Sequence, residues 1–205
     1  MIYYKVLNLD GSCCNGGTGQ WNLPIGDQPG HWMPDIPDPL PCIRGYHLCR
    51  PSDLVQWIGP AIWTAEADGE ILPAGNKVVA GRARLLRRVE IWTTRTAGLF
   101  AADCAEHVLP IFEQQYPTNT RPRMAVQATR DFAEGRISVQ ELNTATHAAW
   151  IASGNYDTPG NAASAASRQT PWATARDAAW AADDENAERA WQTMRLFDYL
   201  EGRVG

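Results

Sequence analysis

No stretch of this chain is hydrophobic for long enough to cross a membrane, although apolar residues make up 44% of its 205 residues. Its start, MIYYKVLNLDG, has neither a basic leader nor a long hydrophobic region and is not typical of a secretory signal. A nucleic-acid footprint is also missing, because the net charge is -5 and the basic run, which holds Arg82, Arg84, Arg87, Arg88 and Arg95, lacks the aromatic interleaving that would point to bases. These absences predict a cytoplasmic protein that binds neither a membrane nor nucleic acid.

Alanine is scarce in the first part of the chain and abundant in the second. Residues 1–92 contain 6 alanines, with 8 basic and 9 acidic residues, whereas residues 93–205 contain 23 alanines, with 10 basic and 14 acidic residues. The first part is instead rich in Pro, Gly, Trp and β-branched residues. We therefore predict two domains in an α+β fold: a small sheet unit with a Cys/His-rich loop at 1–92, and an alanine-rich helical bundle at 93–205.

A long helix is predicted where the composition changes, at 96–116. Its apolar residues recur with helical period and should form one buried stripe: Phe100, Cys104, Val108, Ile111 and Phe112. The acidic residues Asp103, Glu106 and Glu113 should lie mostly off that stripe. Pro110 has no amide hydrogen for the preceding turn, so we expect a kink there.

Turn and capping residues place the elements of the first part. Strands are predicted at 3–9 and 61–66, and a third at 77–92 with a bulge or bend near Gly81. A short helix should start at 51–53 and stop at 59–60. The Gly/Pro-rich segment 12–41 should form a long loop held to the body by buried Trp21 and Trp32.

Five further helices are predicted in the second part. The first starts at Arg121 and ends at a Gly135 cap, and the next begins with a Ser138–Glu141 capping box. Two alanine-dominated helices, at 161–167 and 172–182, should follow a loop at 153–160. A final helix comes after them, and Asp183 or Asp184 should cap it. We expect its buried face to consist of Ala187, Trp191, Met194 and Tyr199. The spaced tryptophans Trp150, Trp172, Trp180 and Trp191 should fill gaps between closely approaching helices.

The loop around residues 42–49 gathers residues that could ligate a metal. Cys42, His47 and Cys49 offer the thiolates and the imidazole that zinc prefers, with Cys13 and Cys14 upstream. Neither C-x2-C nor H-x3-H spacing occurs, however. The favoured interpretation is that the cysteines are small buried hydrophobic residues and that His47 is a structural histidine. Zinc at Cys42, His47 and Cys49 remains the alternative.

The same loop supports a second alternative. Gly45-Tyr46-His47 resembles the short aromatic-histidine element of diphtheria-toxin-type ADP-ribosyltransferases. That resemblance implies NAD as cosubstrate, with His47 against the nicotinamide ribose, and requires a glutamate on a later strand. Glu66 and Glu70 are the candidates.

Acidic residues and a histidine also share the long helix. Asp103 and His107 are four residues apart and can pair on one face, with Glu106 beside them and His147 elsewhere in the chain. A hydrogen-bond network is favoured over catalysis, because a catalytic site would need more convergent groups.

The second part carries LFAADCAEHVLPIFE and RPRMAVQATRDFAEGRIS, followed by an Ala/Trp-rich remainder. Over roughly residues 95–200 it resembles a family of immunity proteins of bacterial polymorphic toxin systems. The first part, with YKVLNLDGSC and CIRGYHLC, resembles a domain of unknown function from phage and actinobacterial proteins. That second resemblance implies Lys5, Cys13, Gly45, His47 and Cys49 as motif positions and no activity.

The leading hypothesis is a non-enzymatic binding protein that neutralises a toxin by occlusion, without a cofactor. Exposed acidic residues near the start of the last helix should meet a basic surface of the protein partner: Asp183, Asp184, Glu185 and Glu188. The alternatives are an enzyme centred on His47 or a phage-encoded factor that binds a host component.

Overall fold

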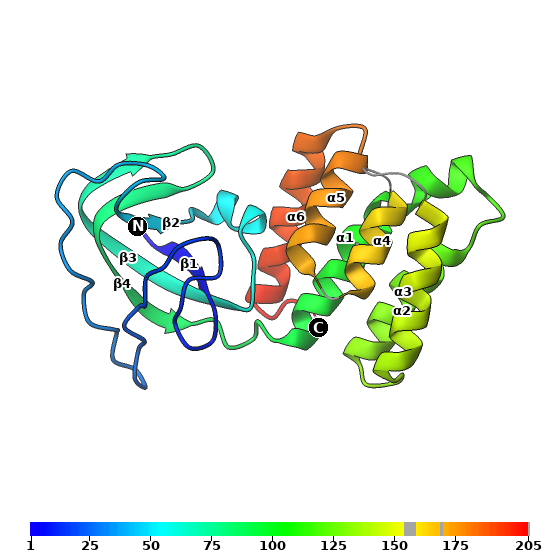
Figure 1. Cartoon of the computed structure of the whole chain (residues 1–205), viewed down its shortest axis with the longest axis horizontal. Helices are drawn as coiled ribbons and strands as arrows, with labels where there is room; N and C mark the ends of the chain where they lie inside the picture. The colour runs from blue at the N-terminus through cyan, green and yellow to red at the C-terminus, as the bar shows by residue number, and fades with distance from the viewer. Residues whose placement is uncertain (154–158, 169, 205) are drawn as a thin grey trace. The chain divides into compact units, whose positions relative to one another are not determined.

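The structure is a computed structural model that describes residues 1–153, 159–168 and 170–204. The chain divides into two compact units, Met1–Glu90 and Ile91–Gly205 (Figure 1). The first contains an antiparallel sheet and the second contains helices, which confirms the predicted α+β class. Most of the predicted loop at 153–160 lies outside the described residues.

The first unit is a curled four-stranded sheet in the order β1-β3-β4-β2. The strands are β1 (Tyr3–Leu7), β2 (Tyr46–Leu48), β3 (Ala61–Pro73) and β4 (Val78–Arg88). The predicted short helix is a 3-10 helix, η1 (Pro51–Gln56), between β2 and β3. Tyr4 of β1 exchanges two backbone hydrogen bonds of 2.8 Å with Cys49, which directly follows β2. The two outer strands are thereby joined, and the sheet closes on itself.

The predicted irregularity near Gly81 is confirmed, but the extra residue lies in the neighbouring strand. The pairing of β3 with β4 shifts between Asp68 and Ile71, opposite Gly81. A β-carbon at Gly81 would lie 2.8 Å from the Ile36 carbonyl oxygen, so only glycine lets the 12–41 loop approach this closely.

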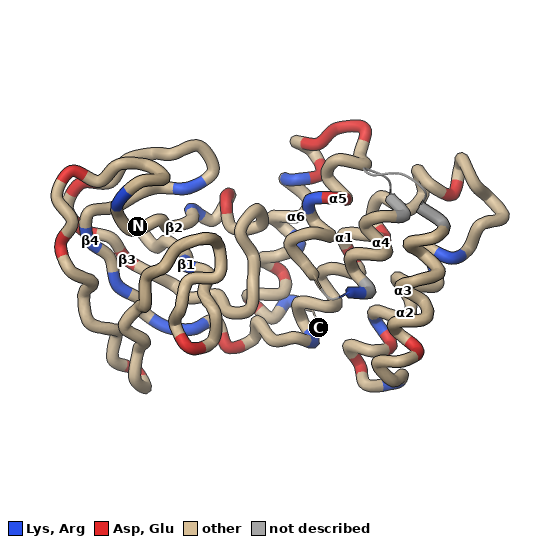
Figure 2. The backbone as a smooth tube through the Cα atoms, in the orientation of Figure 1, with Lys and Arg blue, Asp and Glu red and all other residues tan. Residues whose placement is uncertain are grey.

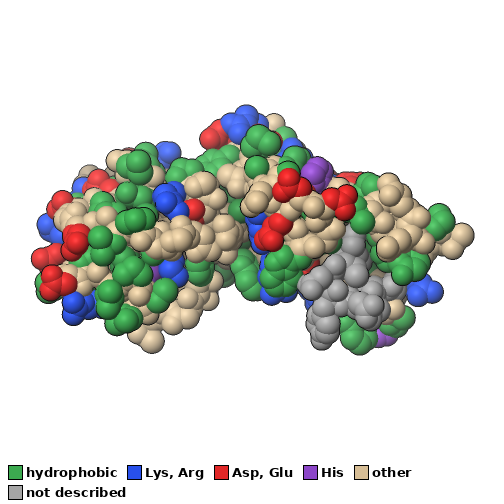
Figure 3. Space-filling view, turned by 90° about the horizontal axis from the view of Figure 1, so that it is seen from above, with side chains coloured by type: hydrophobic (Ala, Val, Ile, Leu, Met, Phe, Trp, Pro, Cys, Tyr) green, Lys and Arg blue, Asp and Glu red, His purple; other side chains and the backbone are tan. Residues whose placement is uncertain are grey.

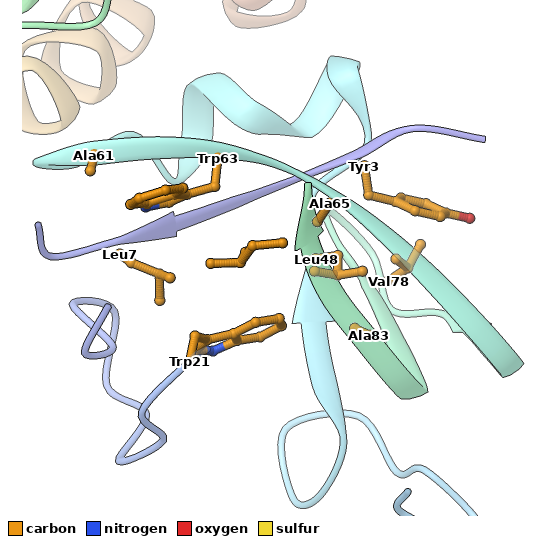
Figure 4. Packing of buried hydrophobic residues seen from close by; sticks show 10 residues of the cluster. Tyr3, Leu7, Trp21, Leu48, Ala61, Trp63, Ala65, Val78 and Ala83 are labelled. Carbon is orange, nitrogen blue, oxygen red and sulfur yellow. The ribbon is translucent and has the colours of Figure 1, made fainter. Parts of the chain in front are cut away.

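The long loop at 12–41 is fastened to the sheet by backbone and by side chains. The amides of Gly30, Met33 and Ile36 donate to carbonyls of Leu85, Ala83 and Gly81, at 2.9, 2.9 and 2.8 Å. Trp21, only 4% exposed, enters a core with Leu7, Leu48 and Trp63 (Figure 4). The prediction of a loop held by a buried indole is thus confirmed for Trp21. Trp32 is instead half-buried, and the centre of its ring lies 4.7 Å and 4.6 Å from the guanidinium carbons of Arg82 and Arg84.

The second unit is built around α1 (Thr94–Gln115). Its predicted apolar stripe is confirmed: Phe100, Cys104, Val108 and Phe112 are buried and Ile111 is half-buried. The helix continues through Pro110. Trp92, which the sequence placed at the end of the first domain, is buried against Phe100 of α1.

Five helices follow α1 among the residues that the structure describes: α2 (Arg121–Ala133), α3 (Val139–Ser153), α4 (Pro159–Ser167), α5 (Pro171–Ala181) and α6 (Glu185–Leu200). Local signals located them well. Gly135 adopts a φ of 72° after α2, Ser138 and Glu141 form their capping box, and Asp184 caps α6. None of the described helices combines the length and the apolar character needed to cross a membrane.

Two predictions about the packing of the helical unit are wrong. Trp150, Trp172 and Trp180 are 58%, 44% and 49% exposed instead of filling the core. Seven of the nine alanines of α4 and α5 are buried and allow close helix contact, which leaves little space for indoles. The buried face of α6 consists of Glu188, Gln192, Leu196 and Tyr199. Of the predicted face, Tyr199 is buried and Trp191 is half-buried against His107, whereas Ala187 and Met194 are exposed.

Candidate functional site

The outward face of α5 carries a tryptophan–arginine–tryptophan ladder. Trp172, Arg176 and Trp180 are spaced four residues apart, which places them on one side of the helix. The guanidinium carbon of Arg176 lies 4.8 Å from the centre of the Trp172 ring and 4.7 Å from that of Trp180. Arg176 also donates to the carboxylate of buried Asp177 at 2.8 Å. The α5 ladder, as we call these three residues, is therefore an exposed yet ordered aromatic surface.

Acidic residues follow the ladder directly, in the turn between α5 and α6 (Figure 2). Asp183 and Glu185 are exposed, and Glu185 Oε1 lies 3.7 Å from Arg189 Nη2. Asp184 has a structural role, because its Oδ1 accepts the amides of Asn186 and Ala187 at 2.9 and 3.1 Å. On the face drawn in Figure 3, acidic side chains lie over both units, several of them on the helical unit.

Glu188, predicted as part of this exposed cluster, is buried, so that part of the prediction is wrong. Only 4% of the residue is exposed. Its Oε2 lies 2.6 Å from His107 Nδ1, and its Oε1 accepts from Gln192 Nε2 at 2.8 Å. His107 in turn stacks on Trp191, with ring centres 3.8 Å apart and planes 1° apart. Glu188 thus ties α6 to α1 and is not available to a partner.

The predicted pair of Asp103 and His107 is not formed, since each binds a different residue. Asp103 is buried, contrary to prediction, and accepts from Arg195 Nε at 2.6 Å and from the Tyr199 hydroxyl at 2.7 Å. Arg130 Nη2 of α2 lies 2.7 Å from its other oxygen. This carboxylate is therefore the centre of a network that joins α1, α2 and α6.

The remaining members of that predicted group lie apart. Glu106 is exposed and pairs with Arg130 and Arg123. His147 on α3 stacks against Trp150. The ion pairs of Glu106 agree with the favoured structural interpretation, because they join α1 to α2, whereas the His147–Trp150 stack lies within α3.

The Cys/His-rich loop of the first unit borders a cavity of about 630 Å³. Residues from β1, the 12–41 loop, β2 and its flanks line it, among them Lys5, Cys13, Trp21, Tyr46, His47, Cys49, Trp57 and Lys77. His47 Nε2 accepts the Cys42 amide at 3.0 Å, so the neutral ring carries its proton on Nδ1. Burial, together with the charges of Lys77 and Lys5, lowers the pKa of His47 and favours this neutral form.

The residues of the zinc alternative do not converge as ligands. His47 Nε2 is occupied by the Cys42 amide, and Cys42 itself is exposed. Burial raises the pKa of Cys49 to about 12, so without a metal this residue is a thiol. Within the described parts of the chain, no three His, Cys, Asp or Glu side chains are grouped so as to hold a metal ion.

The glutamates of the transferase alternative also lie elsewhere. Glu66 on β3 forms an ion pair with Arg84 of β4, and Glu70 is exposed near the end of the same strand. Neither residue lines the cavity that contains His47. The geometry therefore supplies His47 with neither of the two glutamates that the transferase hypothesis named.

Residues 88–176 match the model of a family described as Imm-5 like putative immunity protein. The match supports an immunity role. It extends from the end of β4 into α5 and stops before Trp180 and α6, whereas the resemblance in the sequence covers roughly residues 95–200. The resemblance of the first part to a phage and actinobacterial domain has no support in the comparisons. No curated protein and no solved structure matches the chain.

Two features of these sites were missed by the sequence reasoning. The four-residue spacing of Trp172, Arg176 and Trp180 was visible, but the tryptophans were assigned to the core because large aromatic residues are usually buried. The second feature is the contact between Lys5 of β1 and Trp21 of the 12–41 loop. These residues are far apart in the chain, so no local sequence pattern predicts that they meet.

Proposed function

We propose that this protein is a non-enzymatic immunity protein that binds a toxin and blocks the toxin's active site or target-binding surface. The observation that carries the proposal is the match of residues 88–176 to an immunity family. These residues include α1 to α4 and the first part of α5, so we assign toxin binding to the helical unit.

The α5 ladder is the part of this unit best suited to anchor a partner. Tryptophan and arginine are the residue types that most often contribute strongly to binding at protein interfaces. Arg176 is already held between two indoles, so the ladder loses little side-chain entropy when a partner packs on it.

The acidic turn beside the ladder favours a basic partner surface. Asp183 and Glu185 are exposed and can attract such a surface, whereas Asp184 caps α6 and Glu188 is buried. Peripheral charges of this kind mainly accelerate association, because they act over a distance and are screened by salt. We therefore assign the steering role to Asp183 and Glu185.

The test begins with the protein encoded next to this chain's gene, which is the toxin candidate. Its expression in a bacterial host should arrest growth, and co-expression of this protein should restore growth. Binding of the purified pair is then measured by surface plasmon resonance. Trp180→Ala should weaken binding about tenfold or more, which corresponds to roughly 1.4 kcal/mol. Trp150→Ala is the matched control, because Trp150 is an exposed tryptophan on a different helix.

The charge reversals Asp183→Lys and Glu185→Lys should slow association severalfold at low salt and flatten its salt dependence. If the neighbouring protein is neutralised but all three substitutions leave binding unchanged, the function stands and the surface is wrong. If neither growth rescue nor binding is found, the immunity proposal itself is refuted.

A further inference from the structure

Lys5 of β1 places a positive charge inside the cavity of the first unit. Its Nζ donates to the His47 carbonyl at 3.0 Å and lies 5.0 Å from the centre of the Trp21 ring. Burial lowers the pKa of Lys5, and the charge of Lys77 acts in the same direction. The surroundings therefore disfavour the ammonium ion that they contain.

No carboxylate compensates this charge in the first unit, all of whose residues are described. Its ion pairs involve arginines and leave out both Lys5 and Lys77. Neither Asp nor Glu lines the cavity. Lys77 Nζ lies 4.7 Å from the centre of the Trp57 ring, so each lysine faces an indole instead of an acid. A buried charge without a counter-charge is costly, and a bound anion would remove that cost.

Aromatic rings border the same space. Trp21, Tyr46 and Trp57 line it, and the Trp21 and Tyr46 rings meet edge to face at 5.4 Å. The Tyr46 hydroxyl donates to the Pro34 carbonyl at 2.7 Å, which fixes the position of its ring. The segment 16–19, which holds three glycines, lines the cavity as well. The volume of about 630 Å³ falls within the ~300–1,000 Å³ usual for small-molecule sites.

We propose that this cavity is a binding site for a small organic anion that joins a phosphate or carboxylate to a flat ring. Lys5 and Lys77 bind the anionic group, and the aromatic side chains contact the ring. A cationic ligand would be repelled by the two lysines, and a neutral one would leave their charge uncompensated. The assignment is independent of the immunity proposal, which concerns the helical unit.

The probes separate the two parts of the ligand. AMP carries a ring and a phosphate, and benzoate a ring and a carboxylate, whereas adenosine has only the ring and ribose 5-phosphate only the anion. Isothermal titration calorimetry on the full chain should show binding of AMP, benzoate or both. Where AMP binds, adenosine and ribose 5-phosphate should each bind at least tenfold more weakly. Binding of AMP but not benzoate, or the reverse, identifies the anionic group.

The variant Lys5→Met keeps an unbranched side chain, one atom shorter than lysine, and removes its charge. It should weaken binding of the preferred probe at least tenfold, or about 1.4 kcal/mol. Arg87→Met is the matched control, because Arg87 is an exposed cation of the same unit outside the cavity. Lys77→Met tests the same prediction at a second position if Lys5→Met does not fold.

Three results would overturn the proposal. The first is that neither AMP nor benzoate binds at millimolar concentration. The second is that adenosine binds as tightly as AMP. The third is that the folded Lys5→Met or Lys77→Met protein binds the probe as well as the Arg87→Met control does.

Discussion

Removal of the Asp103 carboxylate is the sharpest test of how the helical unit is held together. The variant Asp103→Ala deletes one buried acceptor that binds Arg130, Arg195 and Tyr199 from two other helices. Hydrogen bonds to charged groups contribute about 1.5–3 kcal/mol each, and loss of one member of a buried ion pair costs about 3–5 kcal/mol.

The structure places the expected cost at the lower end of that range. The side chains of Arg130 and Arg195 are 26% and 28% exposed, so both guanidiniums can still bind water after the substitution. Arg130 also keeps Glu106. The buried Tyr199 hydroxyl is the group that loses its acceptor. We expect a loss of about 3 kcal/mol in the free energy of unfolding, and a melting temperature lower by roughly 10 °C.

Urea denaturation followed by circular dichroism at 222 nm suits this measurement, because the α-helices named above all belong to the second unit. The matched control is Asp198→Ala. Asp198 lies 3.7 Å from the same Arg195 and accepts from Arg203, but its side chain is 31% exposed. Its removal should cost less than about 1 kcal/mol. If Asp103→Ala costs no more than Asp198→Ala, the network does not hold α6 on α1, and the reasoning is wrong.

Two further predictions concern titratable groups of the first unit. Cys42 is exposed, whereas burial raises the pKa of Cys49 to about 12. A maleimide at neutral pH should therefore label Cys42 in the folded protein and Cys49 only after unfolding. Mass spectrometry of the labelled peptides measures this, and equal labelling of both cysteines in the folded protein would contradict the prediction. Because burial lowers the pKa of Lys5, the unfolded chain binds more protons between the folded and unfolded pKa values, and this residue's contribution to stability should rise with pH across that window. The free energy of unfolding of wild type and Lys5→Met should be measured at several pH values up to about 10, the region where an unperturbed lysine titrates. The difference between the two free energies should shift in favour of the wild type as the pH rises. A constant difference would refute the lowered pKa of Lys5.

Features set by neighbouring residues could be predicted from the sequence. The stripe of α1, the Ser138–Glu141 box and the Asp184 cap each depend on residues within a few positions of one another, and the structure contains all three. The change in composition near residue 92 likewise signalled the change from strands to helices.

The errors arise where distant residues decide the outcome. Glu188 and His107 are 81 residues apart, and Asp103 and Tyr199 are 96 apart, so no local pattern announces these partners. The buried face of α6 was misassigned because Glu188 and Gln192 are polar. They can be buried because Gln192 donates to both the Ala175 carbonyl and Glu188. A pattern of hydrophobicity cannot reveal a polar residue that is satisfied by another helix.

The way the sheet of the first unit closes affects how this protein can associate. A free strand edge invites another chain to add a strand, which leads to aggregation or to peptide capture. The bonds between Tyr4 and Cys49 occupy the meeting point of β1 and β2, and the 30–36 segment uses carbonyls along β4. The outer part of β3, beyond its pairing with β1, carries Asp68, Glu70 and Pro73, residue types that discourage strand addition. Addition of a strand to this unit is therefore disfavoured, and a molecule that recognises the unit should do so through its side chains.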